Sequence, residues 1–266
     1  MTLSDLGMDE RERAIMDSLI HRPHWMILFT GPTGSGKSTS LYAILQALAR
    51  PEVNIITVED PVEYALPGVT QIQVNEKAGV TFASALRSIL RQDPDIVMIG
   101  EMRDFETAHI GVQASLTGHL VFSTLHTNDS IGAMIRLTDM GIEPYLAASC
   151  MIGTVAQRLA RRLCPRCRRE IEPPSMMANQ GVERAFEPVG CKHCHNSGYR
   201  GRVGLYEQFV VDDEVREAFV SGAPASVLQV VARKNGFKTL WEMGLSAVQS
   251  GLTSPDELIR VAGGGE

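Results

Sequence analysis

The sequence lacks a long apolar segment. No apolar run approaches the roughly 18 residues that a membrane-spanning helix needs, and no basic stretch followed by an apolar one opens the chain as in a secretory signal. We therefore expect a cytosolic protein, in which thiols stay reduced. Closely spaced cysteines are then to be interpreted as metal ligands or redox groups before disulfides.

The sequence also lacks an excess of positive charge. Its net charge of -6 argues against a protein that coats nucleic acid through bulk charge, although local basic patches stay open. With 44% hydrophobic and 21% charged residues the composition is globular, which excludes global disorder. A length of 266 residues suffices for one large domain or two modest ones.

The most specific pattern in the chain is a phosphate loop. An apolar run over 26–29 predicts a buried strand, residues 40–49 have helical periodicity, and Gly31-x4-Gly36-Lys37-Ser38 lies between them. Glycines let successive backbone N–H groups wrap phosphates without obstruction by Cβ. Lys37 would reach the β- and γ-phosphates of a nucleoside triphosphate and Ser38 would hold Mg²⁺. The predicted nucleotide-binding residues are Gly31, Pro32, Thr33, Gly34, Ser35, Gly36, Lys37, Ser38 and Thr39.

Three further apolar stretches, 55–58, 96–99 and 120–122 with Leu125, each end in polar residues. Continuous apolar runs of this length are typical of strands buried on both faces of a parallel sheet. Helical stretches are expected at 82–92, 105–116 and 129–138. The alternation of strands and helices predicts a doubly wound α/β domain.

Polar residues after these strands should meet at one edge of the sheet, because ligands bind where the carboxyl ends of parallel strands gather. Glu59 with Asp60, Glu101 and His126 occupy such positions. A single acid after a strand is more often a turn or helix-capping group. With a phosphate loop in the same sheet, a role at the nucleotide site becomes the favoured interpretation. We assign Glu101, with Ser38, to the Mg²⁺ and Glu59 to activation of water, and the exchange of these two roles stays an alternative.

Two histidines flank the last of these strands. His126 would sense or stabilise the γ-phosphate, and its competing interpretation is a capping neighbour beside Asn128. His119 lies seven residues earlier, roughly 20 Å away in an extended chain, so we expect only one of the two at a given nucleotide. The other would be structural or would meet a neighbouring subunit.

Four stretches carry a family resemblance. GPTGSGKST, ITVEDPVEY, LRQDPDIVMIGEMRD and TGHLVFSTLHTN resemble, in order, the Walker A, Asp, Walker B and His boxes of secretion ATPases. From about Leu3 onward the chain is similar to the ATPases of type II secretion and type IV pilus assembly. The resemblance implies a RecA-like P-loop core, ATP with Mg²⁺ and a homo-hexamer. The candidate catalytic residues are Glu59, Glu101, His126, His119 and Arg103.

The resemblance also implies a setting. It points to a motor at the inner membrane, cytoplasmic and peripherally attached through platform and cytoplasmic-domain proteins, with anionic lipid as a further contact. The family normally carries an N-terminal domain that helps to close the nucleotide site, and nothing here corresponds to it because the loop begins at Gly31. We therefore expect a C-terminal fragment or a truncated relative with poor turnover. The alternatives are a RecA-like motor on nucleic acid, which the net charge disfavours, and a nucleotide-dependent binding switch.

Four of the five cysteines form two pairs, Cys164-x2-Cys167 and Cys191-x2-Cys194. Each short loop lets two thiolates meet one ion, and four thiolates close a tetrahedral site, so we predict structural zinc. Redox pairing or an iron–sulfur cluster is the alternative. His193 and His195 are near enough to substitute as ligands but are expected at the surface, and Cys150 is expected to be a buried small side chain. The resemblance agrees, because assembly and secretion ATPases carry such an insert and retraction ATPases lack it.

Six arginines surround the first cysteine pair: Arg158, Arg161, Arg162, Arg166, Arg168 and Arg169. Arg158 and Arg162 are four residues apart and would share one side of a helix. The run is either a solvated face or a surface that docks a neighbouring subunit's phosphates, an acidic partner or anionic lipid.

The last third of the chain predicts a small helical subdomain. Gly198, Gly201 and Gly204 suggest a tight return into a short strand, and glycines at 222, 236 and 251 separate short helices. Pro255 is placed to begin the last helix. We expect a RecA-like core with a short N-terminal helix over 1–160, a zinc-binding insert over 161–200, and the return strand with the helical subdomain over 201–266.

Overall fold

The computed structural model describes residues 3–263, which fall into two compact units. The first contains residues 3–32, 37–156 and 208–237, and the second contains residues 33–36, 157–207 and 238–263. Two long strands, β6 (Met151–Leu163) and β9 (Tyr199–Val210), therefore contribute to both units. Within residues 3–263, every helix is too short or too polar to span a bilayer.

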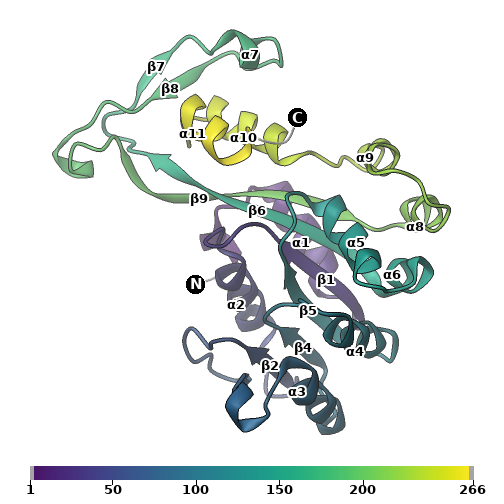
Figure 1. The fold of residues 1–266 in the computed structure, drawn as a ribbon. Helices are drawn as coiled ribbons and strands as arrows, with labels where there is room; N and C mark the ends of the chain where they lie inside the picture. The colour runs from purple at the N-terminus through teal and green to yellow at the C-terminus, as the bar shows by residue number, and fades with distance from the viewer. Residues whose placement is uncertain (1–2, 264–266) are drawn as a thin grey trace. The chain divides into compact units, whose positions relative to one another are not determined.

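A seven-stranded sheet runs through the first unit in the order β3-β2-β4-β5-β1-β6-β9 (Figure 1). The remaining strands are β1 (Trp25–Thr30), β2 (Ile55–Glu59), β3 (Thr70–Gln73), β4 (Ile96–Ile99) and β5 (Leu120–Leu125). From β3 to β6 every neighbouring pair is parallel. The predicted α/β class with a mainly parallel sheet is confirmed.

Helices connect these strands. They are α1 (Glu10–Ile20), α2 (Lys37–Leu48), α3 (Phe82–Ile89), α4 (Phe105–Leu116), α5 (Ser130–Asp139), α6 (Pro144–Cys150), α8 (Asp213–Val220) and α9 (Ala225–Arg233). The three predicted helical stretches are confirmed, and the first ends as a 3-10 turn over Leu90–Gln92. Thr81, Asp104 and Asp129 cap α3, α4 and α5 by accepting a backbone N–H of the first turn.

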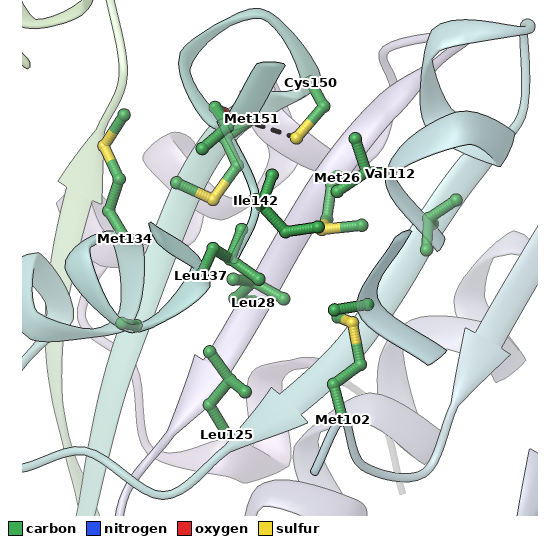
Figure 2. Packing of buried hydrophobic residues seen from close by; sticks show 14 of the residues in the cluster. Met26, Leu28, Met102, Val112, Leu125, Met134, Leu137, Ile142, Cys150 and Met151 are labelled. Atoms are coloured by element: carbon green, nitrogen blue, oxygen red, sulfur yellow. Dashed lines mark hydrogen bonds between the residues drawn. The ribbon is translucent and has the colours of Figure 1, made fainter. Parts of the chain in front are cut away.

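The core of the first unit covers both faces of the sheet. Met26 and Leu28 point into a cluster with residues of α3 to α6 (Figure 2), whereas Ile27 and Phe29 alternate with them and are equally buried. Cys150 belongs to this cluster; burial raises the pKa of its thiol to about 12. Its interpretation as a small buried side chain is confirmed.

The second unit is built from the outer halves of β6 and β9, a hairpin and two helices. The hairpin pairs β7 (Arg169–Ile171) with β8 (Ala185–Glu187) around a short helix, α7 (Ser175–Ala178). Helices α10 (Leu240–Gln249) and α11 (Pro255–Ala262) pack on the hairpin, and Trp241 Nε1 donates to Gln180 Oε1 at 2.8 Å. Pro255 begins α11 as expected.

Two expectations for this region are wrong. Arg158 and Arg162 lie on strand β6, not on a helix, because residues 151–163 continue the sheet beside β9. A spacing of four residues fits one face of a strand as well as one side of a helix, so the spacing did not discriminate. The return strand is also long: β9 covers 12 residues.

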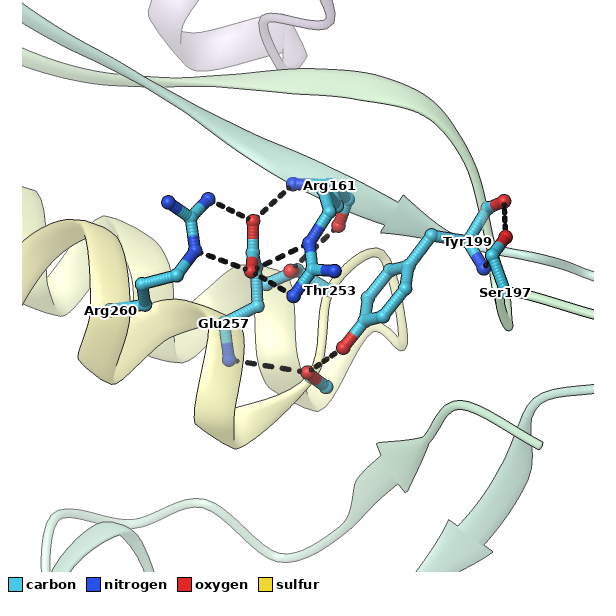
Figure 3. Close-up of polar contacts among 7 residues, drawn as sticks. Arg161, Ser197, Tyr199, Thr253, Glu257 and Arg260 are labelled. Carbon is cyan, nitrogen blue, oxygen red and sulfur yellow. Dashed lines mark hydrogen bonds and ion pairs between the residues drawn. The ribbon is translucent and has the colours of Figure 1, made fainter. Parts of the chain in front are cut away.

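A buried carboxylate ties α11 to β6 (Figure 3). Glu257 is fully buried, accepts the backbone N–H of Arg161 at 2.8 Å, and pairs with the guanidinium groups of Arg161 and Arg260. Burial alone would raise the pKa of this carboxyl, but the hydrogen bonds from Arg260 and Arg161 outweigh it and lower the pKa to about 2. Glu257 therefore stabilises the second unit as a charged group.

Replacing Glu257 should destabilise the protein in a pH-dependent way. Because its folded pKa lies below the ordinary 4.5, the stabilisation is complete above pH 4.5 and is lost as the pH falls towards 2. We expect Glu257→Gln to lower the free energy of unfolding by about 3 kcal/mol at pH 7. The deficit should shrink by about 1 kcal/mol at pH 3.5. Chemical denaturation measures both, and Asp256→Asn, at an exposed position, is the control; a pH-independent deficit would contradict the assignment.

Candidate phosphate-binding site and cysteine cluster

The phosphate loop joins β1 directly to α2. Gly34 and Gly36 have φ values of +78° and +90°, a region that L side chains rarely adopt. A Cβ added at Gly36 would also lie 2.8 Å from Gln157 Nε2 and 3.3 Å from Leu159 Cδ1. The backbone conformation therefore requires glycine at position 36, and a Cβ there would also have to displace the end of the Gln157 side chain.

Two polar groups of the loop suit an anionic ligand. The Ser35 hydroxyl is buried and is the one buried side-chain oxygen or nitrogen in residues 5–263 without a hydrogen-bond partner. The Lys37 ammonium donates to the carbonyl oxygens of Gly31 at 2.7 Å and Pro32 at 3.2 Å, which holds it against the loop. A phosphate oxygen would satisfy the hydroxyl and attract the ammonium, so the residues present fit a bound phosphate.

Glu59 ends β2 and is 4% exposed. Its carboxylate accepts hydrogen bonds from the hydroxyls of Tyr42 and Thr57 and from the side-chain amide of Gln71. All three donors are neutral, so they orient the carboxylate without neutralising it.

Glu101 follows β4, the strand next to β2, and has an arginine and a histidine as neighbours. Its carboxylate pairs with the Arg103 guanidinium, and His126 Nε2, just after β5, lies 3.7 Å from Oε2. Between the two acids, a Cβ on Gly100 would lie 3.3 Å from the Cα of Glu59. Parallel pairing thus brings Glu101, Arg103 and His126 together beside the end of the strand that carries Glu59.

His119 lies at the opposite end of β5 from His126. Its Nδ1 contacts the Ala114 carbonyl oxygen at 2.9 Å and the Thr117 hydroxyl at 3.3 Å, at the carboxyl end of α4. In this chain His119 has the contacts of a helix-terminating group, and it lies away from Glu101 and His126.

The four paired cysteines converge in the second unit. Their Sγ atoms lie within 4.8 Å of one another, and Cys164–Cys191, Cys167–Cys194 and Cys191–Cys194 are separated by 3.9, 3.7 and 3.8 Å. None is in a disulfide. Sulfur atoms tetrahedrally placed around zinc at about 2.3 Å lie about 3.8 Å apart. The donor set and its spacing therefore fit zinc.

The backbone around the cluster favours the thiolate of Cys194, whereas burial raises the pKa of Cys167 to about 12. Cys194 Sγ accepts the N–H groups of Cys191 at 3.2 Å and Gly198 at 3.3 Å. Burial raises the pKa of Cys194, but these hydrogen bonds outweigh it and lower the pKa to about 6. His193 contacts Arg200 and His195 is exposed, and in residues 3–263 neither belongs to the group that could hold a metal.

The structure divides the arginine run. Arg161 binds Glu257, Arg168 lies over the Phe186 ring and donates to the Gly251 carbonyl, and Arg169 pairs with Glu187. These three are therefore tied into the second unit, while Arg162 and Arg166 are exposed.

Sequence reasoning missed Tyr42 and the buried role of Glu257. The available signal for Tyr42 was a hydroxyl inside the otherwise mostly apolar stretch LYAILQAL, since a buried hydroxyl requires a partner. Glu257 was recognised only as an acid in the first turn of a helix.

Removing the Ser35 hydroxyl should stabilise the protein without ligand but weaken its stabilisation by nucleotide. Without ligand, Ser35→Ala should raise the free energy of unfolding by about 1 kcal/mol, because it removes a buried hydroxyl that has no partner. With Mg-ADP added, the variant should gain less stability than the wild type. Thermal unfolding with and without nucleotide checks both, with Ser18→Ala, at an exposed position of α1, as control; equal nucleotide-induced shifts would contradict the fit.

Comparisons with known proteins place this geometry in a family. The sequence profile described as "Type II/IV secretion system protein" matches residues 1–260. The type II secretion system protein HxcR of Pseudomonas aeruginosa is 53% identical over 98% of this chain and 53% of its own length. The type IV pilus assembly ATPase PilB of Thermus thermophilus is 46% identical over 97% of this chain and 30% of its own length.

A solved structure extends the likeness to the fold. The crystal structure of the pilus retraction motor PilT with bound ADP superposes with a TM-score of 0.74 at 28% identity, covering 98% of this chain and 66% of that one. This chain spans about half the length of HxcR and a smaller share of PilB. With its family profile matched almost from end to end, the chain belongs to the type II/IV secretion system protein family.

Proposed function

We propose that the chain is the Mg²⁺-dependent ATPase part of a motor that powers type II secretion or type IV pilus assembly. The observation that carries the proposal is the phosphate loop, with its unpartnered Ser35 hydroxyl and its Lys37 ammonium, on a sheet in which Glu59 ends one strand and Glu101 follows the neighbouring strand. PilB is named as an ATPase and PilT was solved with ADP, which supports nucleotide hydrolysis here. The higher identity to HxcR favours secretion over pilus extension.

Each residue near the strand ends receives a proposed role. The loop residues 31–39 bind the triphosphate, with Ser38 and Glu101 on the side of the Mg²⁺. When bound, Mg²⁺ would neutralise charge that develops on the phosphates. Glu59, held by neutral donors, accepts the proton of the attacking water. Arg103 and His126 hold Glu101, and Arg103 supplies positive charge near it.

The larger assembly is also a proposal. We propose a homo-hexamer, cytoplasmic and attached to the inner membrane through platform and cytoplasmic-domain proteins, with anionic lipid as a further contact. In it, residues 1–160 form the ATPase core, 161–200 the zinc insert, and 201–266 the return strand with the helical subdomain. Arg162 and Arg166 are exposed and available for docking, whereas the other arginines with partners in the second unit hold the insert.

Glu101 is the first residue to test. We expect Glu101→Gln to lower kcat at least 100-fold and to preserve ATP binding, because the amide keeps the shape of the side chain but not its charge. Phosphate release measures turnover, and a fluorescent nucleotide measures affinity. Glu106→Gln, an exposed acid paired with Arg87, is the control. An unchanged rate in Glu101→Gln would remove Glu101 from the mechanism.

The cysteine cluster is tested separately. We expect one zinc ion per chain in reduced protein, and its loss in Cys164→Ser together with destabilisation of the insert, because such sites contribute on the order of 10 kcal/mol to folding. Elemental analysis and proteolysis of the insert measure the two effects. Cys150→Ala, at the buried cysteine outside the cluster, should keep its zinc. Iron in place of zinc, or no metal, would reject the assignment.

A further inference from the structure

Tyr42 connects the phosphate-loop helix to the acid at the end of β2. It lies on α2, the helix that begins at Lys37, and its side chain is 1% exposed. Its hydroxyl donates to Oε2 of Glu59. Five residues of helix, about 7.5 Å of rise, separate Lys37 from Tyr42, so one rigid element carries both a predicted phosphate ligand and a partner of Glu59.

The direction of the Tyr42 proton is determined by its surroundings. The hydroxyl oxygen accepts the backbone N–H of Glu63 at 3.3 Å and the side-chain amide of Gln71 at 3.4 Å. The hydroxyl hydrogen is donated to Glu59. Burial and the hydrogen bond to Glu59 raise the pKa of Tyr42, which keeps the hydroxyl protonated at neutral pH. Tyr42 is therefore a committed donor to Glu59.

The hydrogen bonds that Glu59 accepts show which of its oxygens the Tyr42 hydroxyl orients. Oε1 accepts from Thr57 Oγ1 at 2.6 Å and from Gln71 Nε2 at 3.0 Å, and Oε2 accepts from Tyr42. An ionised carboxylate offers about four acceptor sites. Among the described residues three are filled, so the one left is on Oε2, the oxygen that Tyr42 holds.

We propose that Tyr42 is a positioning residue for Glu59: its hydroxyl fixes the orientation of Oε2, and with it the acceptor site at which Glu59 takes a proton from water. The inference rests on the proposed function, because it needs Glu59 to act in hydrolysis. Tyr42 touches neither substrate nor water in this role; it acts through Glu59.

The test uses the full chain and removes only the hydroxyl. Tyr42→Phe should lower kcat about tenfold or more, because a misdirected base loses catalytic efficiency steeply with orientation, while KM for ATP stays within about twofold. Tyr64→Phe is the matched control, since the Tyr64 ring packs edge-on against Tyr42 but is half-exposed. Its kcat should equal that of the wild type.

A double substitution separates positioning from a merely structural role. In a Glu59→Gln background, measured in single-turnover reactions, adding Tyr42→Phe should cost nothing further, because the acceptor it orients no longer acts as a base. A wild-type rate in Tyr42→Phe, or an equal fold-loss in both backgrounds, overturns the inference alone. A wild-type chain that binds ATP but does not hydrolyse it overturns the proposed function, and the inference with it.

Discussion

Parallel pairing of β1 with β5 on one side and β6 on the other is the constraint on which the rest of the structure depends. Because β2, β4, β5 and β1 run the same way, the residues that follow each strand meet at one edge of the sheet. The chain places Glu59, Glu101 and His126 there, beside the strand that leads into the phosphate loop. These residues are dozens of positions apart in the sequence, and the parallel pairing of the strands brings them to the same edge of the sheet.

The two acids at this edge differ in their partners although they lie at the ends of neighbouring strands, Glu59 as the last residue of β2 and Glu101 just after β4. Glu59 is almost fully buried and receives neutral donors, whereas Glu101 faces a guanidinium and an imidazole. A carboxylate held by neutral donors keeps its full charge for accepting a proton, and one paired with a guanidinium is already partly compensated. This difference supports assigning water activation to Glu59 and the metal-proximal position to Glu101.

The second unit depends less on apolar packing than the first. Its hairpin has two strands of three residues each, and four convergent cysteines and the buried Glu257 supply fixed points instead. Arginines that look like one basic run in the sequence are used individually here, on a carboxylate, an aromatic ring and a backbone carbonyl. Three of the six arginines in the run are thus internal ties of the second unit.

The sequence by itself determined the fold class, the phosphate loop and the cysteine group, because each depends on a local pattern: continuous apolar runs alternating with helical periodicity, the glycine spacing of the phosphate loop, and x2 loops between cysteines. Only the tertiary structure decided whether residues 151–163 are strand or helix, since a four-residue spacing satisfies both. It also decided the partners of Tyr42 and Glu257, which lie 17 and 96 residues away in the chain. Hydrogen bonds over such distances follow from strand order and helix packing, which no local pattern encodes.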